Sequence, residues 1–438
     1  MKKLLGSSLL FVCGAVSAQA ADGPIDLTLK GNVVLNFGYA GNYKLNEASA
    51  PSVVKVDKAA EQDDATLSVL AKANLGSDVS FALQTDFYGT ASDLTRSADG
   101  GCGQNAPAVA SSKCASNIAV KRAFATIGSP YGSLILGDRE DATYIIHNSA
   151  PDVSPLARSN GGYYYYWVVA PSNHRNLTQD NDSRYDDRSE KISYVSPTFD
   201  NLTAVFTYVP SLSSSVGSGS PAPATASDYG LYLPNGQVIN ADYGGDAYGG
   251  GMYYSDSLRG VGIKVDSTVL QANVANLRIW QQGVQLSYAG FTFGASSLVR
   301  DVPSNASINN TYSDFAASNL AGAGTTASAI ARAAVFAGNS YTFGLRYALG
   351  PVSVSTSFFH DNSKSLAVLN GSGRSDNTDF YDLGAAYDMG AAFDGGPRVT
   401  FRAGVGYVSY SGSVANAASP WANNNDGLVV VTGAKLDF

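Results

Sequence analysis

The sequence predicts an all-β protein, a transmembrane antiparallel up-and-down β-barrel of about sixteen strands. Three observations predict this fold class. Apolar and polar residues alternate over many segments, 46 glycines and 26 tyrosines accompany a hydrophobic content of 45%, and short and long connections follow one another along the chain. After residue 20 the chain has no run near the ~20 consecutive apolar residues that a transmembrane helix needs. We therefore expect strands to cross the membrane.

The first alternating segment comprises residues 25–39. Leu27 and Leu29 fall on its apolar parity, while Lys30 and Asn32 fall on its polar parity. In a soluble sandwich the apolar face would be core, whereas in a membrane barrel it meets lipid and the polar face lines the lumen. The segment is long for a soluble strand, so we expect the second arrangement.

Further segments repeat the pattern to the end of the chain. An even number of strands returns both chain termini to the side of the tight turns. The remaining predicted strands are 64–75, 79–88, 118–127, 133–138, 191–196, 202–209, 247–254, 261–269, 279–288, 291–299, 340–348, 352–360, 379–388, 398–410 and 428–438.

Short and long connections alternate along the chain. A closed up-and-down barrel with tight turns at one end and long loops at the other gives this alternation, whereas a sandwich or propeller has no reason to. Tight turns are expected at 76–78, 128–132, 289–290 and 349–351. Long connections are expected at 40–63, 89–117, 139–190, 210–246, 300–339, 361–378 and 411–427.

Aromatic residues cluster near both ends of the predicted strands, where the two interfaces of a membrane lie. Tyr194, Tyr254, Tyr288, Tyr347, Tyr387 and Phe438 would form the girdle on the tight-turn side. Phe37, Tyr39, Phe87, Tyr208, Phe358 and Tyr407 would form the girdle on the long-loop side.

Residues 1–20 are typical of a signal peptide. Lys2 and Lys3 precede an apolar run, and Ala18-Gln19-Ala20 has the small-x-small pattern of a cleavage site. We therefore expect one barrel domain, 21–438, in an exported protein.

Charge and cysteine content narrow the possible partners and chemistry. Removal of Lys2 and Lys3 would make the net charge of −8 more negative by two, so nucleic acid is not an expected partner. Cys102 and Cys114 would form one disulfide in an oxidising compartment, with two free thiols as the alternative. The three histidines stand in no catalytic or metal-binding spacing, so we expect no catalytic residue, metal or cofactor.

Three segments stand in order along the chain: KRAFATIGSPYGSLILGDRE (121–140), RSEKISYVSPTFDNLTAVFTY (188–208) and LVVVTGAKLDF (428–438). Together they resemble the trimeric general porins of Gram-negative outer membranes. The resemblance extends over the mature chain as a pattern. It implies a homotrimer in the outer membrane, in contact with the lipid bilayer and lipopolysaccharide, that passes ions and small hydrophilic solutes. It also implies that the barrel assembly machinery reads Phe438.

In that family the third loop folds into the barrel and narrows the pore. The longest connection, 139–190, stands at this place. Asp152 resembles the first acidic position of the family's loop, but Leu156 stands where a glutamate is common. Further candidates for the acidic side are Asp138, Glu140 and Asp141.

The family also has a basic ladder on the opposite wall, which is thinner here. Lys121 and Arg188 resemble two of its positions. The inward direction of Lys121, rather than Arg122, assumes that Ile118, Val120 and Phe124 point outward. The thin ladder and the acidic net charge lead us to expect a mild cation preference. Further lumen-lining cations expected from parity are Lys30, Lys72, Lys264, Arg346 and Arg402.

Two other functions remain open. The aromatic run Tyr163–Trp167 could serve a substrate-selective channel, although packing of the loop against the wall is the simpler interpretation. Alternatively, the barrel could display adhesive or receptor loops at 210–246 and 300–339. A conducting lumen would favour a channel, and a closed lumen would favour display.

Overall fold

The computed structural model describes residues 25–41, 59–76, 78–89, 118–156, 164, 167–168, 190–210, 246–272, 277–301, 336–365, 375–391, 396–412 and 425–438. The predicted signal peptide, Cys102, Cys114 and Arg188 lie outside these residues. Among the residues described, no helix has the length and apolar character to cross a membrane.

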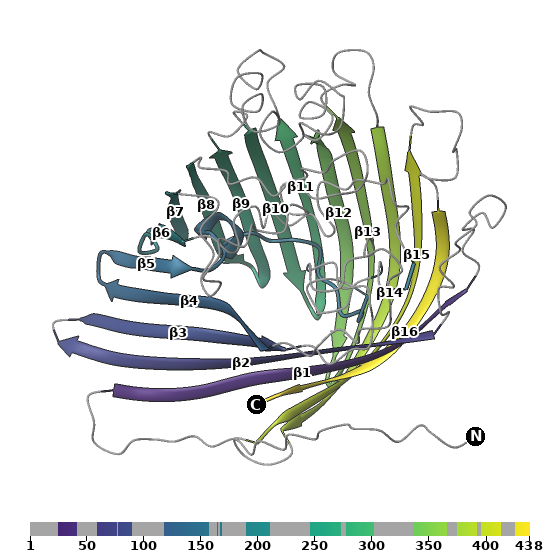
Figure 1. Cartoon of the computed structure of the whole chain (residues 1–438), viewed down its shortest axis with the longest axis horizontal. Helices are drawn as coiled ribbons and strands as arrows, with labels where there is room; N and C mark the ends of the chain where they lie inside the picture. The colour runs from purple at the N-terminus through teal and green to yellow at the C-terminus, as the bar shows by residue number, and fades with distance from the viewer. Residues whose placement is uncertain are drawn as a thin grey trace, which may run out of the picture.

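The chain forms one closed barrel in which each strand pairs antiparallel with the next and the last pairs with the first (Figure 1). This confirms the predicted all-β barrel of sixteen strands. The strands are β1 (Ile25–Gly41), β2 (Ala59–Gly76), β3 (Val79–Gly89), β4 (Ile118–Ser129), β5 (Gly132–Asp138), β6 (Glu190–Val195), β7 (Leu202–Val209), β8 (Ala247–Leu258), β9 (Val261–Ala272), β10 (Leu277–Tyr288), β11 (Phe291–Asp301), β12 (Phe336–Leu349), β13 (Val352–Ser365), β14 (Ser375–Ala391), β15 (Arg398–Gly412) and β16 (Asn425–Asp437). A single helical turn, α1 (Ala142–Ile145), follows β5.

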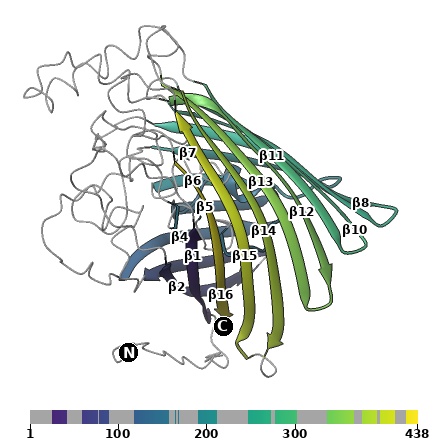
Figure 2. The ribbon, with the colours of Figure 1, turned by 90° about the vertical axis from the view of Figure 1, so that its right-hand side faces the viewer.

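The apolar parity of the strands points away from the lumen. In β1, Leu35 and Phe37 are exposed on the outer surface, while Val34 and Asn36 are buried on the inner side. The same alternation runs through β15, where Phe401 and Val405 are exposed. Figure 2 shows the strands β11–β16 side by side in one wall. An outer apolar band of this kind is what a bilayer requires.

Tight turns join the strands at one end of the barrel. Several of their residues have the positive φ that two-residue hairpin loops demand, among them Asp78 (62°), Arg259 (52°) and Ala289 (48°). The long connections lie at the other end, with one exception, the short link 273–276 between β9 and β10.

The last residue of the chain takes part in closing the barrel. The backbone N–H of Phe438 donates to the carbonyl of Gly31 (3.0 Å), and the N–H of Gly31 donates back to the carbonyl of Phe438 (2.8 Å). A Cβ on Gly31 would lie 2.5 Å from Cζ of Phe438, so the ring rests directly on the glycine. The β1–β16 seam therefore extends to the chain terminus.

Candidate functional site

Residues 139–156, the described part of the connection after β5, turn inward and follow the inner wall of the barrel. They are called the inner loop below. The turn begins at Gly137, whose φ is +118° and where a Cβ would lie 2.5 Å from the carbonyl oxygen of Ala123. Only glycine fits this conformation readily. The backbone N–H of Ala142 then donates to Oγ1 of Thr207 on β7 (2.9 Å), which ties the root of the inner loop to the wall.

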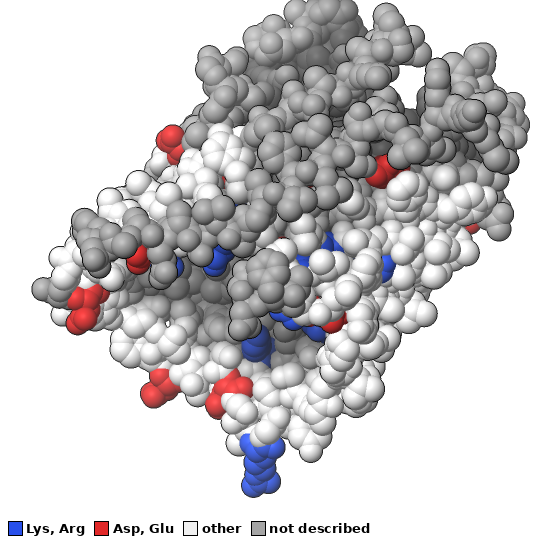
Figure 3. Space-filling model, turned by 90° about the horizontal axis from the view of Figure 1, so that it is seen from below, with Lys and Arg blue, Asp and Glu red and all other residues white. Residues whose placement is uncertain are grey.

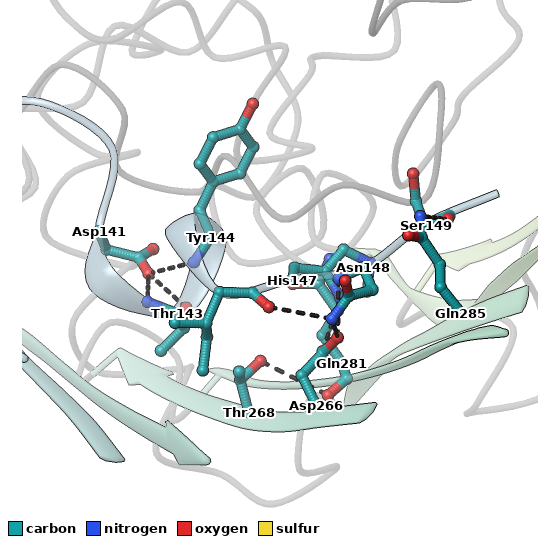
Figure 4. A network of polar contacts seen from close by, with 11 residues as sticks. Asp141, Thr143, Tyr144, His147, Asn148, Ser149, Asp266, Thr268, Gln281 and Gln285 are labelled. Atoms are coloured by element: carbon teal, nitrogen blue, oxygen red, sulfur yellow. Dashed lines mark hydrogen bonds and ion pairs between the residues drawn. The ribbon is translucent and has the colours of Figure 1, made fainter. Parts of the chain in front are cut away.

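Asp141 starts α1 as its N-cap. Its Oδ1 accepts hydrogen bonds from the backbone N–H groups of Thr143 (2.6 Å) and Tyr144 (2.9 Å), as Figure 4 shows. The side chain is fully buried. Asp141, predicted as part of the acidic side of a constriction, therefore holds the first turn of the helix.

A buried carboxylate on β9 clamps the middle of the inner loop. Asp266 accepts from the backbone N–H of Asn148 (2.7 Å), from Nδ2 of Asn148 (2.8 Å) and from Nδ1 of His147 (2.9 Å) (Figure 4). On β10, Nε2 of Gln285 donates to the carbonyl of Ser149 (2.8 Å). Several donors on one buried carboxylate fix the position of the loop firmly.

Inward-facing glycines on the wall make room for the inner loop. A Cβ on Gly294 of β11 would lie 2.6 Å from Cδ of Pro151, and one on Gly344 of β12 would lie 2.8 Å from Cβ of Ala150. Any side chain at these positions would push the loop off the wall. The inner loop also crowds Gly249, Gly283, Gly384 and Gly404.

Asp152 lies against the wall. Its carboxylate accepts from Oγ of Ser355 (3.0 Å) and Oγ of Ser357 (2.6 Å), both on β13, and from the backbone N–H of Ser154 (2.7 Å). The buried Asp382 of β14 lies beside it. The residue predicted for the acidic side of the constriction is thus bonded to the wall.

The chain beyond the inner loop reaches an apolar cluster inside the barrel. Tyr164 stacks on Phe380 of β14, with ring centroids 4.4 Å apart. Trp167 lies against Gly38 of β1, and the hydroxyl of Tyr410 donates to the carbonyl of Val168 (3.1 Å). This apolar seat comprises Ala40, Leu156, Tyr164, Trp167, Val168, Phe359, Phe380, Val408, Tyr410, Val429 and Val431, all buried.

A charged cluster stands at the root of the inner loop. Arg122 of β4 forms ion pairs with Asp86 of β3 (3.3 Å) and with Glu140. Arg139 lies over the ring of Phe124 at 4.5 Å. Burial lowers the pKa of Arg139, and Glu140 partly offsets that effect. Asp138, at the end of β5, is also buried.

The sequence pattern did not identify Arg122 as an inward-facing cation, because β4 contains a bulge. Asp86 pairs with Arg122 and Phe87 pairs with Val120, so the pairing skips Lys121. The bulge reverses the parity after Val120 and brings Phe124 to the inner side with Arg122. The assumption that Val120 and Phe124 share an outward face was therefore wrong. The side chain of Lys121 lies outside the described part of the chain.

The five lumen-lining cations predicted from parity all lie on inward parity in the half of the barrel nearer the tight turns. Among the described residues, Arg398 and Lys435 share this parity, but they form ion pairs with Asp388 and Asp437. Lys264 is two residues from Asp266, Arg346 is two from Gly344, and Arg402 is two from Gly404. Figure 3 shows lysine and arginine side chains within the hollow at this end. The set is called the basic collar below and comprises Lys30, Lys72, Lys264, Arg346 and Arg402.

Comparisons with known proteins give a family and a set of similar folds. The family model described as Gram-negative porin matches residues 6–419. No protein in a curated collection matches.

Three solved structures illustrate the similar folds. A loop-deletion mutant of OmpT from Vibrio cholerae is 10% identical (TM-score 0.48; 95% of this chain and 100% of that chain covered). An anion-selective porin from Comamonas acidovorans is 12% identical (TM-score 0.48; 94% and 100% covered). A mutant porin from Rh. blastica is 12% identical (TM-score 0.43; 94% and 100% covered).

Proposed function

Because the chain belongs to the Gram-negative porin family and is an outer-membrane β-barrel channel, we propose that it passes ions and small hydrophilic solutes by passive diffusion. One observation supports this function most directly. Lys30, Lys72 and Lys264 lie on inward parity and are exposed. A charged ammonium group inside a membrane barrel needs water around it, so these positions favour a water-filled lumen.

The inner loop supports a constricted channel rather than a closed one. It follows the wall from β7 to β15 through contacts with Thr207, Asp266, Ser355 and Gly404. A loop held against the wall narrows the lumen on one side and leaves the other side to solutes. Solutes would then pass between the inner loop and the wall around β2 and β3, away from the Arg122–Glu140 pair on β4 and from Trp167 at Gly38 of β1.

The sign of the ion preference needs revision. The thin ladder and the acidic net charge led to an expected mild cation preference. The exposed inward charges in the described residues are, however, Lys30, Lys72, Lys264 and Arg398 against one acid, Asp26, and Arg398 is paired with Asp388. Charges that ions can approach count for more than the total. We therefore propose a weak preference for anions.

Two alternatives receive less support. Tyr164 and Trp167 are buried in the apolar seat, so they favour packing over an aromatic track for substrates. The loops of the display alternative lie largely outside the described residues, and water-exposed lysines in the lumen favour conduction.

The proposed assembly is a homotrimer in the outer membrane, surrounded by lipid and lipopolysaccharide. The family supports this assembly. We also propose that the barrel assembly machinery recognises the C-terminal strand with Phe438, which lies at the β1–β16 seam.

The test is the current through the purified protein in a planar bilayer under a salt gradient. Conductance steps in groups of three are expected. The sign of the reversal potential should show that anions pass more readily than cations. No steps from a folded protein would overturn the channel and favour the display alternative. A reversal potential of the opposite sign would restore the cation preference.

A further inference from the structure

The basic collar has a regular relation to the inner loop. On β9, β12 and β15, the loop touches Asp266, Gly344 and Gly404, and on β15 it also touches Gly406, farther from the tight turns. The next inward-facing position toward the tight turns is basic in each strand. These three positions are Lys264, Arg346 and Arg402.

The wall formed by β1 and β2, opposite β9, also carries positive charges. Lys30 on β1 and Lys72 on β2 are both exposed, and these strands lie across a sixteen-stranded barrel from β9. Lys72 pairs in the β-ladder with Asp26, the one exposed acid on the inner side of these two strands among the residues described. Cations therefore lie on opposite walls of the part of the lumen between the inner loop and the tight turns. This space is called the chamber below the inner loop.

Apart from Asp26, the acids of the described inner wall are buried or paired with a cation. Near the tight turns, Asp388 pairs with Arg398, and Asp437 pairs with Lys435. Asp86 bonds Arg122, and Asp266 bonds His147 and Asn148. Asp64 and Asp382 are buried as well. The charge that a solute meets below the inner loop is thus mainly positive, and the low-dielectric wall of the barrel strengthens its field.

We infer that this chamber is a binding site for small multivalent anions, molecules that carry two or more carboxylate or phosphate groups. The inference rests on the proposed channel function and adds a solute class to it. A monovalent anion interacts with one lysine at a time, whereas a multivalent anion gains from several cations of the collar at once. Such solutes would be retained longer and would reduce the current of a simple salt.

The test measures block of the single-channel current by citrate at neutral pH, with acetate as the monovalent comparison at equal ionic strength. Citrate is expected to block at lower concentration than acetate. In a variant with Lys30→Gln, Lys72→Gln and Lys264→Gln, half-block should need about 1.5- to 5-fold more citrate for each lysine removed. Asp26→Asn should have the opposite effect and strengthen the block.

The matched control is Lys364→Gln, which removes the same charge from an exposed, outward-parity position near the long-loop end of β13. Citrate block should be unchanged there. Equal block of the wild type and the triple variant, both with normal conductance, would overturn the inference. Block by citrate no stronger than block by acetate would also overturn it. Absence of conductance in the wild type would overturn the proposed function and this inference with it.

Discussion

Single side chains decide where the inner loop lies. Asp266 illustrates this best, because one buried carboxylate receives three N–H donors from His147 and Asn148. Removing one partner of such a group leaves the others buried and unsatisfied, which costs more than the bonds themselves contribute. The position of the loop is therefore sensitive to this one residue.

Asp266→Ala should loosen the inner loop and lower the free energy of unfolding by about 3 kcal/mol. Urea titration in lipid vesicles measures the stability, and single-channel recording should show noisier, larger steps. Asp266→Asn retains one acceptor oxygen and should have a smaller effect. Ser267→Ala, at the neighbouring exposed position on outward parity, is the control and should behave as the wild type. If Asp266→Ala gives conductance steps of unchanged size and noise, the other contacts are sufficient to hold the inner loop in place.

Gly344→Val should displace the inner loop from β12, because a Cβ there already falls 2.8 Å from Ala150. Overpacking of this kind costs about 1–3 kcal/mol. The expected readout is a changed unitary conductance with the barrel still folded. Gly250→Val on β8 is the matched control, since the nearest atom to its Cβ is the carbonyl oxygen of Val205 at 3.3 Å. A similar change in both variants would argue against displacement of the loop.

At the scale of elements, the inner loop and the chain beyond it are held by two kinds of anchor. Polar bonds fix the part near β9 and β13, while the apolar seat holds Trp167 against Gly38. Polar contacts set position, and apolar burial supplies most of the stabilisation. Loss of either anchor should thus affect different stretches of the loop.

Trp167→Ala should lower the free energy of unfolding by about 3–5 kcal/mol, because it empties a buried site. The position of Asn148 at Asp266 should persist, which keeps the unitary conductance closer to the wild type than Asp266→Ala does. Trp280→Ala on β10 is the control, since that indole is exposed on the outer face. An equal loss of stability from both tryptophans would contradict a special role for the apolar seat.

The strands were predictable from the sequence, and the course of the inner loop was not. Alternation in segments such as 25–39 and 398–410 follows directly from one face meeting lipid. The bulge at Lys121 cannot be recognised from the alternation, so the sequence did not place Arg122 on the inner face. Asp152 lies in a loop without periodicity, so nothing local indicated that its carboxylate would meet Ser355 and Ser357. Nor did the strand pattern indicate that several glycines of the wall provide space for the loop.

On the scale of the whole molecule, the distribution of charge matters more than its sum. The chain carries a net charge of −8, yet the exposed inward charges described are mostly lysines. Exposed charges act over roughly 10 Å at 0.1 M salt and 3 Å at 1 M. The ion preference of the channel should therefore depend on ionic strength.

At a fixed ratio of salt across the bilayer, the reversal potential should shrink toward zero as the mean concentration rises from 0.1 M to 1 M. The physical reason is screening of Lys30, Lys72 and Lys264. The measurement is a series of reversal potentials on one protein preparation, with the triple glutamine variant as control. A reversal potential independent of concentration would contradict a preference set by exposed lysines.

The contacts of the inner loop relate its length to the circumference of the barrel. Between His147 and Leu156 the chain touches β9, β10, β11, β12, β13, β14 and β15 in turn. The number of residues in this segment therefore matches the number of strands that it passes, because successive residues contact successive strands, some of them two neighbouring strands at once. One inserted residue would shift every later contact away from its glycine or serine. Side chains in this stretch can change more freely than the number of residues can.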